Sequence, residues 1–399
     1  MIRALHVIPA LAPRYGGPSQ AVLGVCRALR DAGVEALIAT TDADGPGRLP
    51  VPVGQVTDYR GAPAIFFPRQ WSESFKYSAP LAAWLRQRVA EFDLVHVHAV
   101  FSHACLAAAS ACRRHGVPYL VRPLGTLDPW SLGQKRLRKR LLWHLGVKQM
   151  LHGAAAIHYT TAAERRLAEG PLGLERGVVV PLGVDEELLA ETVRPELFRR
   201  HFPELGQDPY VLVLSRLHPK KGLEVFLEAF QQVVRQPALG HWRLVVGGDG
   251  EPSYVASLKR LARGMAGGGP SAVTFTGWLA GREKAAALRG ASLFALPSRQ
   301  ENFGLAVVEA MACGVPVLVS PQVNLAEEVQ AAGAGWVAPL DGDHLARVLA
   351  EALADADARA ARGAAGRRLA LERFTWPAVA AQLLELYRSL RSPVPSLAG

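Results

Sequence analysis

The sequence predicts an α/β protein made of two doubly wound domains, each built on a parallel sheet. Three observations support this fold class. The chain has 399 residues, more than one hydrophobic core normally organises. Short apolar runs alternate with helical patterns along both halves, which is typical of parallel strands joined by helices. The alternation lapses over Gly183–Pro195, which indicates a linker between the domains.

In the first half, the apolar run Ala4–Pro9 is expected to be the first strand rather than a secretory signal, because it is short and followed by early prolines. The turn Arg14–Ser19 then opens a helix that ends near Asp31. The later strands are expected at Val34–Ala39, Leu94–His98, Tyr119–Arg122, Ala155–Tyr159 and Val178–Pro181, and the helices at Leu81–Glu91, Ala99–His115, Gln134–Leu151 and Ala162–Glu169.

The second half repeats the alternation. Its strands are expected at Tyr210–Leu214, Arg243–Val246, Val273–Thr276, Leu293–Leu296 and Val317–Val319. The stretch Asp355–Arg373 is rich in alanine and arginine but is still predicted to be helical. Thr375 is a good N-cap for a last helix, about Trp376–Leu390. We therefore expect a first domain over residues 1–185 and a second over 195–375, with a helix over about 376–391 packing back on the first domain.

The composition narrows the classes of partner. The formal net charge of +10 favours nucleotide phosphates, an anionic membrane surface or nucleic acid. The four cysteines form no C-x-x-C pair and no histidine cluster has metal-ligand spacing, so we expect reduced thiols and no metal site. No apolar stretch approaches the roughly 20 residues that a membrane span needs. A cytoplasmic location is expected.

One loop follows the strand Tyr210–Leu214 and opens a helix. It reads Ser215-Arg216-Leu217-His218-Pro219-Lys220-Lys221-Gly222. Ligands of doubly wound sheets bind at the carboxyl ends of the strands. The guanidinium of Arg216, the ammonium of Lys221 and the helix N-terminus suit a diphosphate. A solvated basic loop is the alternative.

A second loop follows the strand Leu293–Leu296. Glu301 falls in the loop, and Glu309 falls inside an otherwise apolar helix, where a carboxylate needs hydrogen-bond donors. Ribose hydroxyls are such donors, and Asn302, Phe303 and Gly304 present main-chain N–H groups. The alternative is that Glu301 caps the helix and Glu309 pairs with a core lysine or arginine. The ligand-binding interpretation is favoured, because the carboxylate and the glycine occur together.

Two glycine pairs also follow strands. Gly247-Gly248-Asp249-Gly250 allows close approach of a ligand to the main chain at Gly248, and Gly16-Gly17 does so after the first strand. Tight turns are the alternative for both. The fingerprint G-x-G-x-x-G is absent, since Ser253 takes its last position, and this argues against a nicotinamide dehydrogenase.

In their order and spacing these pieces resemble family four of the retaining glycosyltransferases, whose fold is called GT-B. The matching segments are Gly16-Gly17-Pro18, Val180–Asp185, Ser215-Arg216 with Lys220-Lys221-Gly222, Phe275-Thr276-Gly277-Trp278, and the glutamates Glu301 and Glu309 with seven residues between them. The resemblance covers nearly the whole chain and implies two Rossmann-like domains facing across a cleft. Members of the family take part in polysaccharide assembly.

The resemblance also implies roles for individual residues. Arg216 and Lys221 neutralise the donor diphosphate and stabilise the leaving group. Glu309 accepts hydrogen bonds from the ribose. The remaining donor-site roles are these: Glu301 and the amides of Asn302, Phe303, Gly304 and Leu305 hold the sugar, Trp278 lies near the base, and Gly17 approaches the phosphates. No metal and no other cofactor is implied, because side chains and helix dipoles replace the cation.

The chain departs from the family pattern at one position. Many relatives carry a histidine in the loop after the strand Tyr119–Arg122, where this chain has Leu124. His98, at the end of a neighbouring strand, is the substitute that we expect to act in catalysis. The alternative is a core histidine with satisfied hydrogen bonds.

The acceptor side has a basic segment. No Asp or Glu occurs from Pro129 to Ala163, and an apolar stripe of Leu137, Leu141 and Leu145 accompanies the basic residues. This combination suits an interfacial helix on anionic lipid. The alternative is a domain helix whose stripe is buried in the core. The basic residues concerned are Lys135, Arg136, Arg138, Lys139 and Arg140.

The function expected from these patterns is transfer of a sugar from a nucleotide-diphosphate sugar to a lipid-linked or polysaccharide acceptor, with the enzyme peripheral on the inner face of the membrane. A sugar-nucleotide epimerase of the same fold is one alternative. A basic nucleic-acid-binding protein is another, but no recognition-helix, RNA-binding or zinc-finger signature supports it, so no nucleic-acid partner is expected.

Overall fold

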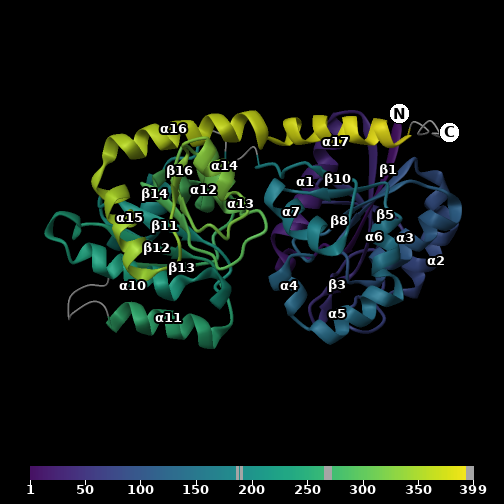
Figure 1. Ribbon diagram of the computed structural model, residues 1–399, viewed down its shortest axis with the longest axis horizontal. Helices are drawn as coiled ribbons and strands as arrows, with labels where there is room; N and C mark the ends of the chain where they lie inside the picture. Colours follow the sequence, from purple (N-terminus) through teal and green to yellow (C-terminus); the bar gives the residue numbers. More distant parts are fainter. Residues whose placement is uncertain (186–187, 189–191, 265–271, 392–399) are drawn as a thin grey trace. The chain divides into compact units, whose positions relative to one another are not determined.

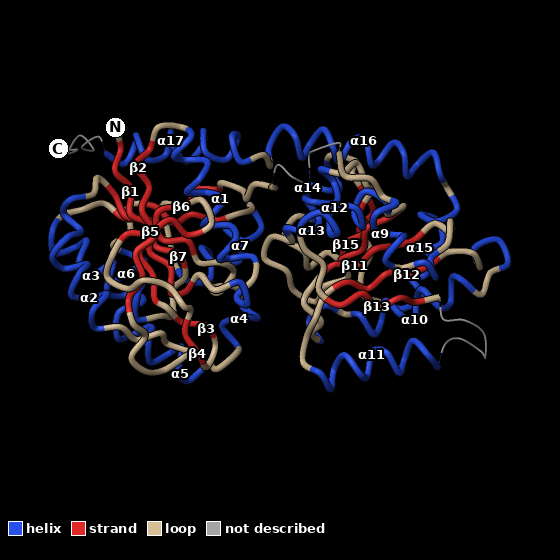
Figure 2. Tube along the Cα trace, turned by 180° about the vertical axis from the view of Figure 1, so that it is seen from behind, coloured by secondary structure: helices blue, strands red, loops and turns tan. Residues whose placement is uncertain are grey.

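The computed structural model describes residues 1–185, 188, 192–264 and 272–391, which form two compact units (Figure 1). The first unit contains residues 1–183 together with the C-terminal helix that begins at Trp376, and the second contains Val184–Thr375. In each unit the strands lie at the centre with helices around them (Figure 2). The predicted fold class, two doubly wound α/β domains, is confirmed.

The first unit is built on an eight-stranded sheet of order β10-β9-β8-β7-β1-β2-β6-β5, which is parallel except for the antiparallel pair β5–β6. A two-stranded hairpin, β3 (Ala43–Asp44) and β4 (Gly47–Arg48), lies outside it. The strands of the sheet are β1 (Ile2–Ala10), β2 (Val34–Thr41), β5 (Val56–Tyr59), β6 (Ala62–Phe67), β7 (Leu94–His98), β8 (Tyr119–Arg122), β9 (Ala156–Tyr159) and β10 (Gly177–Val179). Since β2 and β7 flank β1, the strand order reverses between β1 and β7.

Helices cover both faces of this sheet. One face carries the apolar core, with side chains such as Leu5, Val97 and Val121 packed against α2 (Ala79–Arg88) and α3 (His103–His115). Helix α1 (Gly17–Asp31) packs beside α17 (Trp376–Arg391), as Figures 1 and 2 show. Helix α7 (Ala162–Leu172) joins β9 to β10. The expectation that a last helix belongs to the first domain agrees with the position of α17 in the first unit.

The basic segment does not form the single helix expected over Gln134–Leu151; that prediction is wrong. The structure has α4 (Pro129–Gly133), α5 (Arg136–Leu142), a π-helical turn at Trp143–Val147 and α6 (Lys148–His152). Lys135 has a φ of 49° and Gly146 a φ of 157°, and neither conformation continues a right-handed helix. The helical pattern is therefore interrupted at both residues.

The second unit has a six-stranded parallel sheet of order β13-β12-β11-β14-β15-β16. Its strands are β11 (Tyr210–Leu214), β12 (Arg243–Gly247), β13 (Val273–Gly277), β14 (Leu293–Leu296), β15 (Val317–Val319) and β16 (Gly335–Val337). Its helices are α9 (Glu196–His201), α10 (Leu223–Val234), α11 (Pro252–Gly264), α12 (Gly281–Gly290), α13 (Leu305–Ala312), α14 (Ala326–Ala331), α15 (Gly342–Ala354) and α16 (Ala356–Arg373). The strand order reverses between β11 and β14, which is where doubly wound sheets bind ligands.

The four cysteines are free, and Cys26, Cys105 and Cys112 are buried. Within the part of the chain that the structure describes, no helix combines the length and the apolar character that crossing a bilayer requires.

Candidate functional site

The two loops predicted to bind the donor lie at the switch point of the second sheet. The loop after β11 runs from Ser215 into the 3-10 turn η5 (Pro219–Lys221), and Gly222, with a φ of 64°, leads into α10. The loop after β14 runs from Pro297 to Gly304, whose φ of 80° opens α13. Because β11 and β14 are neighbours in the sheet, their loops meet at one edge.

Direct contacts join these loops. Lys221 Nζ and Glu301 Oε2 form an ion pair, and their side chains are only 9% and 18% exposed. Beside it, the main-chain N–H of Arg299 donates to Lys220 O over 2.7 Å, and Lys220 Nζ donates to Gln300 Oε1 over 3.2 Å. The structure therefore brings together a cation and a carboxylate that the sequence assigned separately to the diphosphate and to the sugar.

Arg216 is exposed and makes no ion pair with a described residue. Burial lowers the pKa of His218 below its usual value, and the positive charges of Arg216, Lys220 and Lys221 add to this shift. The loop after β11 is thus a locally positive surface, as a diphosphate-binding loop requires.

Glu309 is buried in α13 and has a partner inside the protein. Its Oε1 lies 2.6 Å from Nζ of Lys284 on α12. Burial raises the pKa of Glu309, Lys284 counteracts this rise, and Asp185 adds to it. The contact with a lysine is the one that the alternative interpretation of Glu309 required. The second carboxylate oxygen forms no hydrogen bond with a described residue, so a ribose-binding role remains a prediction.

The two predicted donor-site glycines differ in whether packing requires them. A Cβ on Gly248, whose φ is 133°, would lie 1.8 Å from Ser215 O, so the loops after β11 and β12 can pack closely only with glycine there. A Cβ on Gly17, the first residue of α1, would meet no atom within 4 Å. Packing inside the first unit therefore does not demand glycine at position 17, whereas packing in the second unit demands it at position 248.

Two aromatic residues of the predicted donor site differ in burial. Trp278 follows the edge strand β13 and is 56% exposed, so its indole is available to a ligand. Phe303 is buried and packs edge-on against Phe374, with ring centroids 5.9 Å apart. Phe303 can therefore contribute to the site through its main chain, and the same applies to Asn302, Gly304 and Leu305 at the start of α13.

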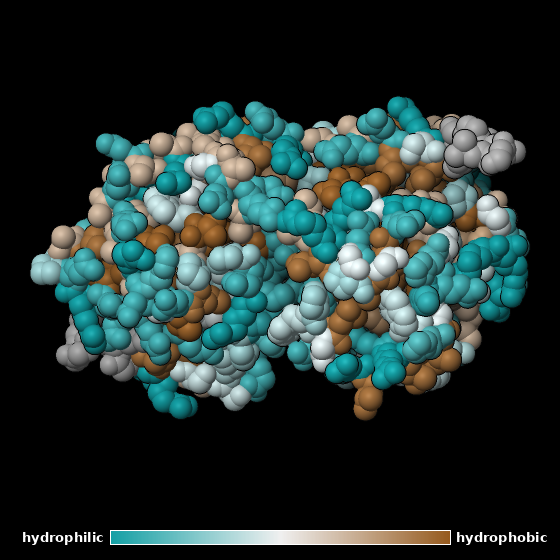
Figure 3. Space-filling model, viewed as in Figure 1, coloured by the Kyte–Doolittle hydropathy of each residue, from teal (hydrophilic) through white to brown (hydrophobic). Residues whose placement is uncertain are grey.

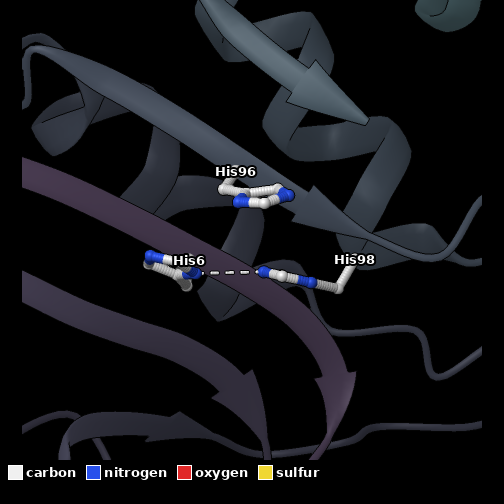
Figure 4. Close-up of side chains that lie close together, drawn as sticks. All are labelled: His6, His96 and His98. Atoms are coloured by element: carbon white, nitrogen blue, oxygen red, sulfur yellow. Dashed lines mark hydrogen bonds between the residues drawn. The ribbon is translucent and has the colours of Figure 1, made fainter. Parts of the chain in front are cut away.

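In the first unit, His98 belongs to a buried polar cluster at the β1/β7 switch point. His6 on β1 and His96 and His98 on β7 point toward one another (Figure 4), and His6 Nδ1 lies 3.0 Å from His98 Nε2. His158 on β9 and Tyr387 on α17 continue the cluster. Sequence reasoning missed every member but His98, although the pattern His-x-His within a strand signals two side chains on one face.

The nitrogens of His6, His96 and His98 lie within 4.8 Å of one another, a spacing that could hold a metal ion. The surroundings fit a cation poorly. Burial lowers the pKa of each of the three rings, the positive charge of the buried Arg122 adds to this shift, and every nitrogen of these rings except His98 Nδ1 already has a hydrogen-bond partner. We therefore interpret the cluster as a hydrogen-bond network.

The basic segment presents its apolar stripe to solvent. Leu137, Leu141 and Leu145 are 85%, 59% and 69% exposed, so the alternative in which this stripe is buried in the core is wrong. Figure 3 shows hydrophobic residues among hydrophilic ones over α5, at the lower edge of the first unit in this view. The basic residues of this segment differ in exposure and in contacts. Lys135, Arg136 and Arg140 are exposed. Arg138 donates to Ser74 Oγ, and Lys139 donates to Ser131 O.

Comparisons with known proteins agree with this geometry. The family model described as "Glycosyl transferases group 1" matches residues 208–355, and that described as "Glycosyl transferase 4-like domain" matches residues 16–183. A GDP-mannose-dependent alpha-(1-6)-phosphatidylinositol monomannoside mannosyltransferase of Mycobacterium tuberculosis is 35% identical over 52% of this chain and 55% of its own length. The chain thus matches about half the length of that relative.

Other relatives match over more of the chain. A D-inositol 3-phosphate glycosyltransferase of Stackebrandtia nassauensis is 30% identical over 96% of this chain and 90% of its own length. Among solved structures, Anabaena HepE in complex with UDP and glucose has a TM-score of 0.76 and 23% identity, covering 98% of this chain and all of that one. These matches confirm the GT-B fold. With both family models matched in chain order, this chain belongs to the family of glycosyl transferases group 1.

Proposed function

We propose that this protein is a retaining glycosyltransferase that moves a sugar from a nucleoside-diphosphate sugar to a lipid-linked or polysaccharide acceptor. The observation that carries the proposal is the pairing of Lys221 with Glu301 at the switch point of the second sheet. A diphosphate needs cations and a sugar needs an acceptor of hydrogen bonds, and both groups are held on neighbouring loops there.

The donor requires no metal in this proposal. Arg216 is exposed and without an ion pair among the described residues, and Lys221 can exchange Glu301 for phosphate oxygens. Together they supply two positive charges, which offset the charge that develops on the departing diphosphate. The relatives point to the donor class: one is named as GDP-mannose-dependent, and HepE is described with UDP and glucose.

The transfer itself proceeds on one face of the sugar. The acceptor oxygen forms a bond to the anomeric carbon on the side from which the diphosphate leaves. The electron pair of the broken C–O bond goes to the diphosphate, and the hydroxyl proton of the acceptor passes to a diphosphate oxygen. Glu301 and the amides at the start of α13 hold the sugar, Glu309 holds the ribose, and Trp278 contacts the base.

The acceptor is lipid-linked in this proposal because the first unit exposes a surface that suits a membrane. Lys135, Arg136 and Arg140 are exposed beside the leucine stripe, and each contributes on the order of 1 kcal/mol on anionic lipid. Trp130, 43% exposed in the adjoining α4, adds an aromatic ring of the kind found at membrane–water interfaces. The name of the mannosyltransferase relative contains a phosphatidylinositol monomannoside, which is a glycolipid.

The proposal is tested by screening UDP-, GDP- and ADP-sugars for thermal stabilisation in EDTA, followed by product analysis with n-octyl glycosides as lipid-linked acceptors. A donor that binds the native state raises the melting temperature by mass action. Transfer to an octyl glycoside with retained anomeric configuration is expected. Donor turnover that needs no acceptor and yields an epimerised sugar would instead identify an epimerase, and the absence of any stabilising nucleotide sugar would refute both.

A further inference from the structure

The buried histidines of the first unit form a continuous hydrogen-bond chain whose far end is the main-chain carbonyl of Val180. A carbonyl oxygen only accepts, so His158 Nε2, 2.7 Å away, carries a proton. Burial, with a contribution from Arg122, lowers the pKa of His158 to about 3. At neutral pH the ring therefore has one proton, and its Nδ1 accepts from His96 Nε2 at 3.1 Å.

The next member of the hydrogen-bond chain is Tyr387, which lies between His96 and His6. Burial and the neighbouring histidines hold the pKa of His96 well below its usual value, so its Nδ1 is an acceptor. The Tyr387 hydroxyl lies 2.8 Å from that Nδ1 and donates its single proton to it. The Tyr387 oxygen then accepts from His6 Nε2 at 3.4 Å.

His98 is the first donor of the chain. Burial lowers the pKa of His6 to about 3, so the His6 Nδ1 accepts from His98 Nε2 over 3.0 Å (Figure 4). His98 is also neutral, because burial and the charge of Arg122 hold its pKa well below the usual value. Its Nδ1 is therefore an unprotonated acceptor, and it is buried without a hydrogen-bond partner among the described residues.

Arg122 offers complementary groups on the neighbouring strand. It is the register partner of His98 on β8, it is 2% exposed, and its Nε and Nη1 lack an acceptor in the described structure. A buried polar group that has no hydrogen-bond partner destabilises the folded protein. An unpartnered acceptor and unpartnered donors on register-paired residues together match a hydroxyl group, which donates its proton to nitrogen and accepts on oxygen.

The main chain is strained at the same two strand ends. Ala99, directly after His98, has a φ of 95°, and Leu124, two residues after Arg122, has a φ of 59°. The N–H of Ala99 donates to Arg122 O over 2.9 Å, which links the two ends. Non-glycine residues in the left-handed region tend to occur at functional sites, where the fold tolerates the strain.

We propose that Tyr387 is a positioning residue: through His6 it holds His98 in the tautomer whose Nδ1, together with Arg122, receives the acceptor hydroxyl. This inference rests on the proposed sugar transfer. In the bound state the hydroxyl donates to His98 Nδ1, which orients its oxygen. As the new C–O bond forms, the O–H turns from His98 to a diphosphate oxygen and its proton goes to the diphosphate, so His98 stays neutral and takes up no proton.

The tautomers are measured directly by two-dimensional 15N NMR of the full chain with 15N-labelled histidine, and a spectrum of His98→Asn assigns the His98 signals. In the wild type, His6, His96, His98 and His158 are expected to be neutral and protonated on Nε2. In Tyr387→Phe the chain is cut, and His98 is expected to populate both tautomers. A wild-type His98 protonated on Nδ1, or a His98 unaffected by Tyr387→Phe, would overturn the proposal.

Kinetics supply the second readout, with the octyl glycoside that the wild type uses as the probe. Tyr387→Phe is expected to reduce kcat/KM for the acceptor roughly tenfold, the size of one hydrogen bond, without changing the donor Kd. His98→Asn, whose amide oxygen lies near the position of Nδ1, should retain more transfer than His98→Gln, whose oxygen lies near that of Nε2. Equal acceptor kinetics in Tyr387→Phe and the wild type would contradict the positioning role.

Tyr159→Phe is the matched control. Tyr159 is on β9 of the same sheet, fully buried, and its hydroxyl has no hydrogen-bond partner among the described residues. Removing this hydroxyl should leave the tautomers and the acceptor kinetics as in the wild type. The NMR measurement needs no substrate. If the wild type transfers no sugar, the proposed function fails, whereas the hydrogen-bond chain is still confirmed or refuted by the tautomers.

Discussion

Lys221 and Glu301, 80 positions apart in the chain, neutralise one another at the edge where β11 and β14 end. A donor diphosphate must compete with Glu301 for the ammonium group of Lys221. The ion pair therefore holds Lys221 in place without a ligand and also opposes the binding of phosphate, so the two functions of Glu301 can be separated by substitution.

Glu301→Gln should change the binding of a nucleoside diphosphate and of the corresponding nucleotide sugar in opposite directions. Without the competing carboxylate, UDP or GDP should bind as tightly as to the wild type or more tightly. The nucleotide sugar should lose about 1.5–3 kcal/mol, because the sugar loses a charged hydrogen-bond partner. Isothermal titration calorimetry measures both. Equal weakening of the two ligands would mean that Glu301 serves only to position Lys221.

Glu309→Gln should weaken donor binding by about 1.5–3 kcal/mol, if the carboxylate accepts from the ribose. The variant also leaves Lys284 without its partner, so unfolding in urea must be measured alongside calorimetry. Glu283→Gln is the control, because Glu283 is on the same helix as Lys284 and pairs with the exposed His201. A loss of stability with unchanged donor affinity would show that the Glu309–Lys284 pair is structural.

Reversing three exposed charges should abolish binding to anionic vesicles. The structure favours Lys135→Glu, Arg136→Glu and Arg140→Glu together, because Lys139 is engaged with Ser131 and the ring of Phe101. Sedimentation with phosphatidylglycerol vesicles at low salt should retain the wild type and lose the variant, with donor affinity unchanged. Replacing Leu137 and Leu141 by serine should weaken binding at any salt concentration. A wild type that ignores anionic vesicles at low salt would rule out the membrane surface.

The first unit should lose stability as the pH falls below 6.5. The folded-state pKa values of the four cluster histidines are depressed, so these residues stay neutral in the fold but take up protons when it unfolds. Neutral burial of these histidines stabilises the fold fully above pH 6.5, which is their pKa in the unfolded chain. This stabilisation falls as the pH drops from 6.5 toward the folded-state pKa values, which are about 3 for His6 and His158. Four such groups remove roughly 5 kcal/mol between pH 7.5 and 5.5.

The other ionisable groups around the cluster do not offset this loss. Arg122 stays charged, because burial lowers its pKa only to about 10, and burial raises the pKa values of Cys26 and Tyr387. Hydrogen exchange of the β7 and β9 amides at both pH values, as a function of urea, measures the effect in the first unit. Protection that is the same at pH 5.5 and 7.5 would contradict neutral burial of the histidines.

Gly24→Ala should destabilise the protein, although alanine favours a helix by about 1 kcal/mol. A Cβ on Gly24 in α1 would lie 2.2 Å from Cζ2 of Trp376, the first residue of α17. Overpacking of this kind costs about 1–3 kcal/mol. In a Trp376→Leu background the clash disappears, so the same substitution should stabilise. Gly342→Ala, whose Cβ meets nothing within 4 Å, is the control in urea unfolding.

The sequence predicted the fold class and the strand-end loops because both depend on local patterns. The strands β5, β6 and β16 were not predicted, because β5 and β16 are brief runs and Pro63 lies inside β6. The pairing of Lys221 with Glu301 needs the strand order, which no local pattern contains. Predicting the histidine cluster would require the relative positions of β1, β7, β9 and α17, because all four elements contribute side chains. Only His96 and His98 are close together in the sequence.

The basic segment is a second case in which local sequence patterns leave the structure undecided. Its composition was enough to suggest an interfacial surface, but the periodicity of Leu137, Leu141 and Leu145 fits a buried stripe and an exposed one equally well. Exposure in the structure distinguishes the two. The break at Gly146 was visible as a glycine in the sequence, yet glycine alone does not show whether a helix continues through it.

The division of the chain has a consequence for the order in which the protein acquires its structure during synthesis. The second unit is continuous from Val184 to Thr375, whereas the first is completed by α17, nearly 200 residues after its last strand. On the ribosome, the complete sequence of the second unit emerges before α17 does. Until then the polar sheet face of His6, His96 and His158 lacks Tyr387, and we expect it to stay hydrated, so the nascent first unit depends on α17 to exclude water from these histidines.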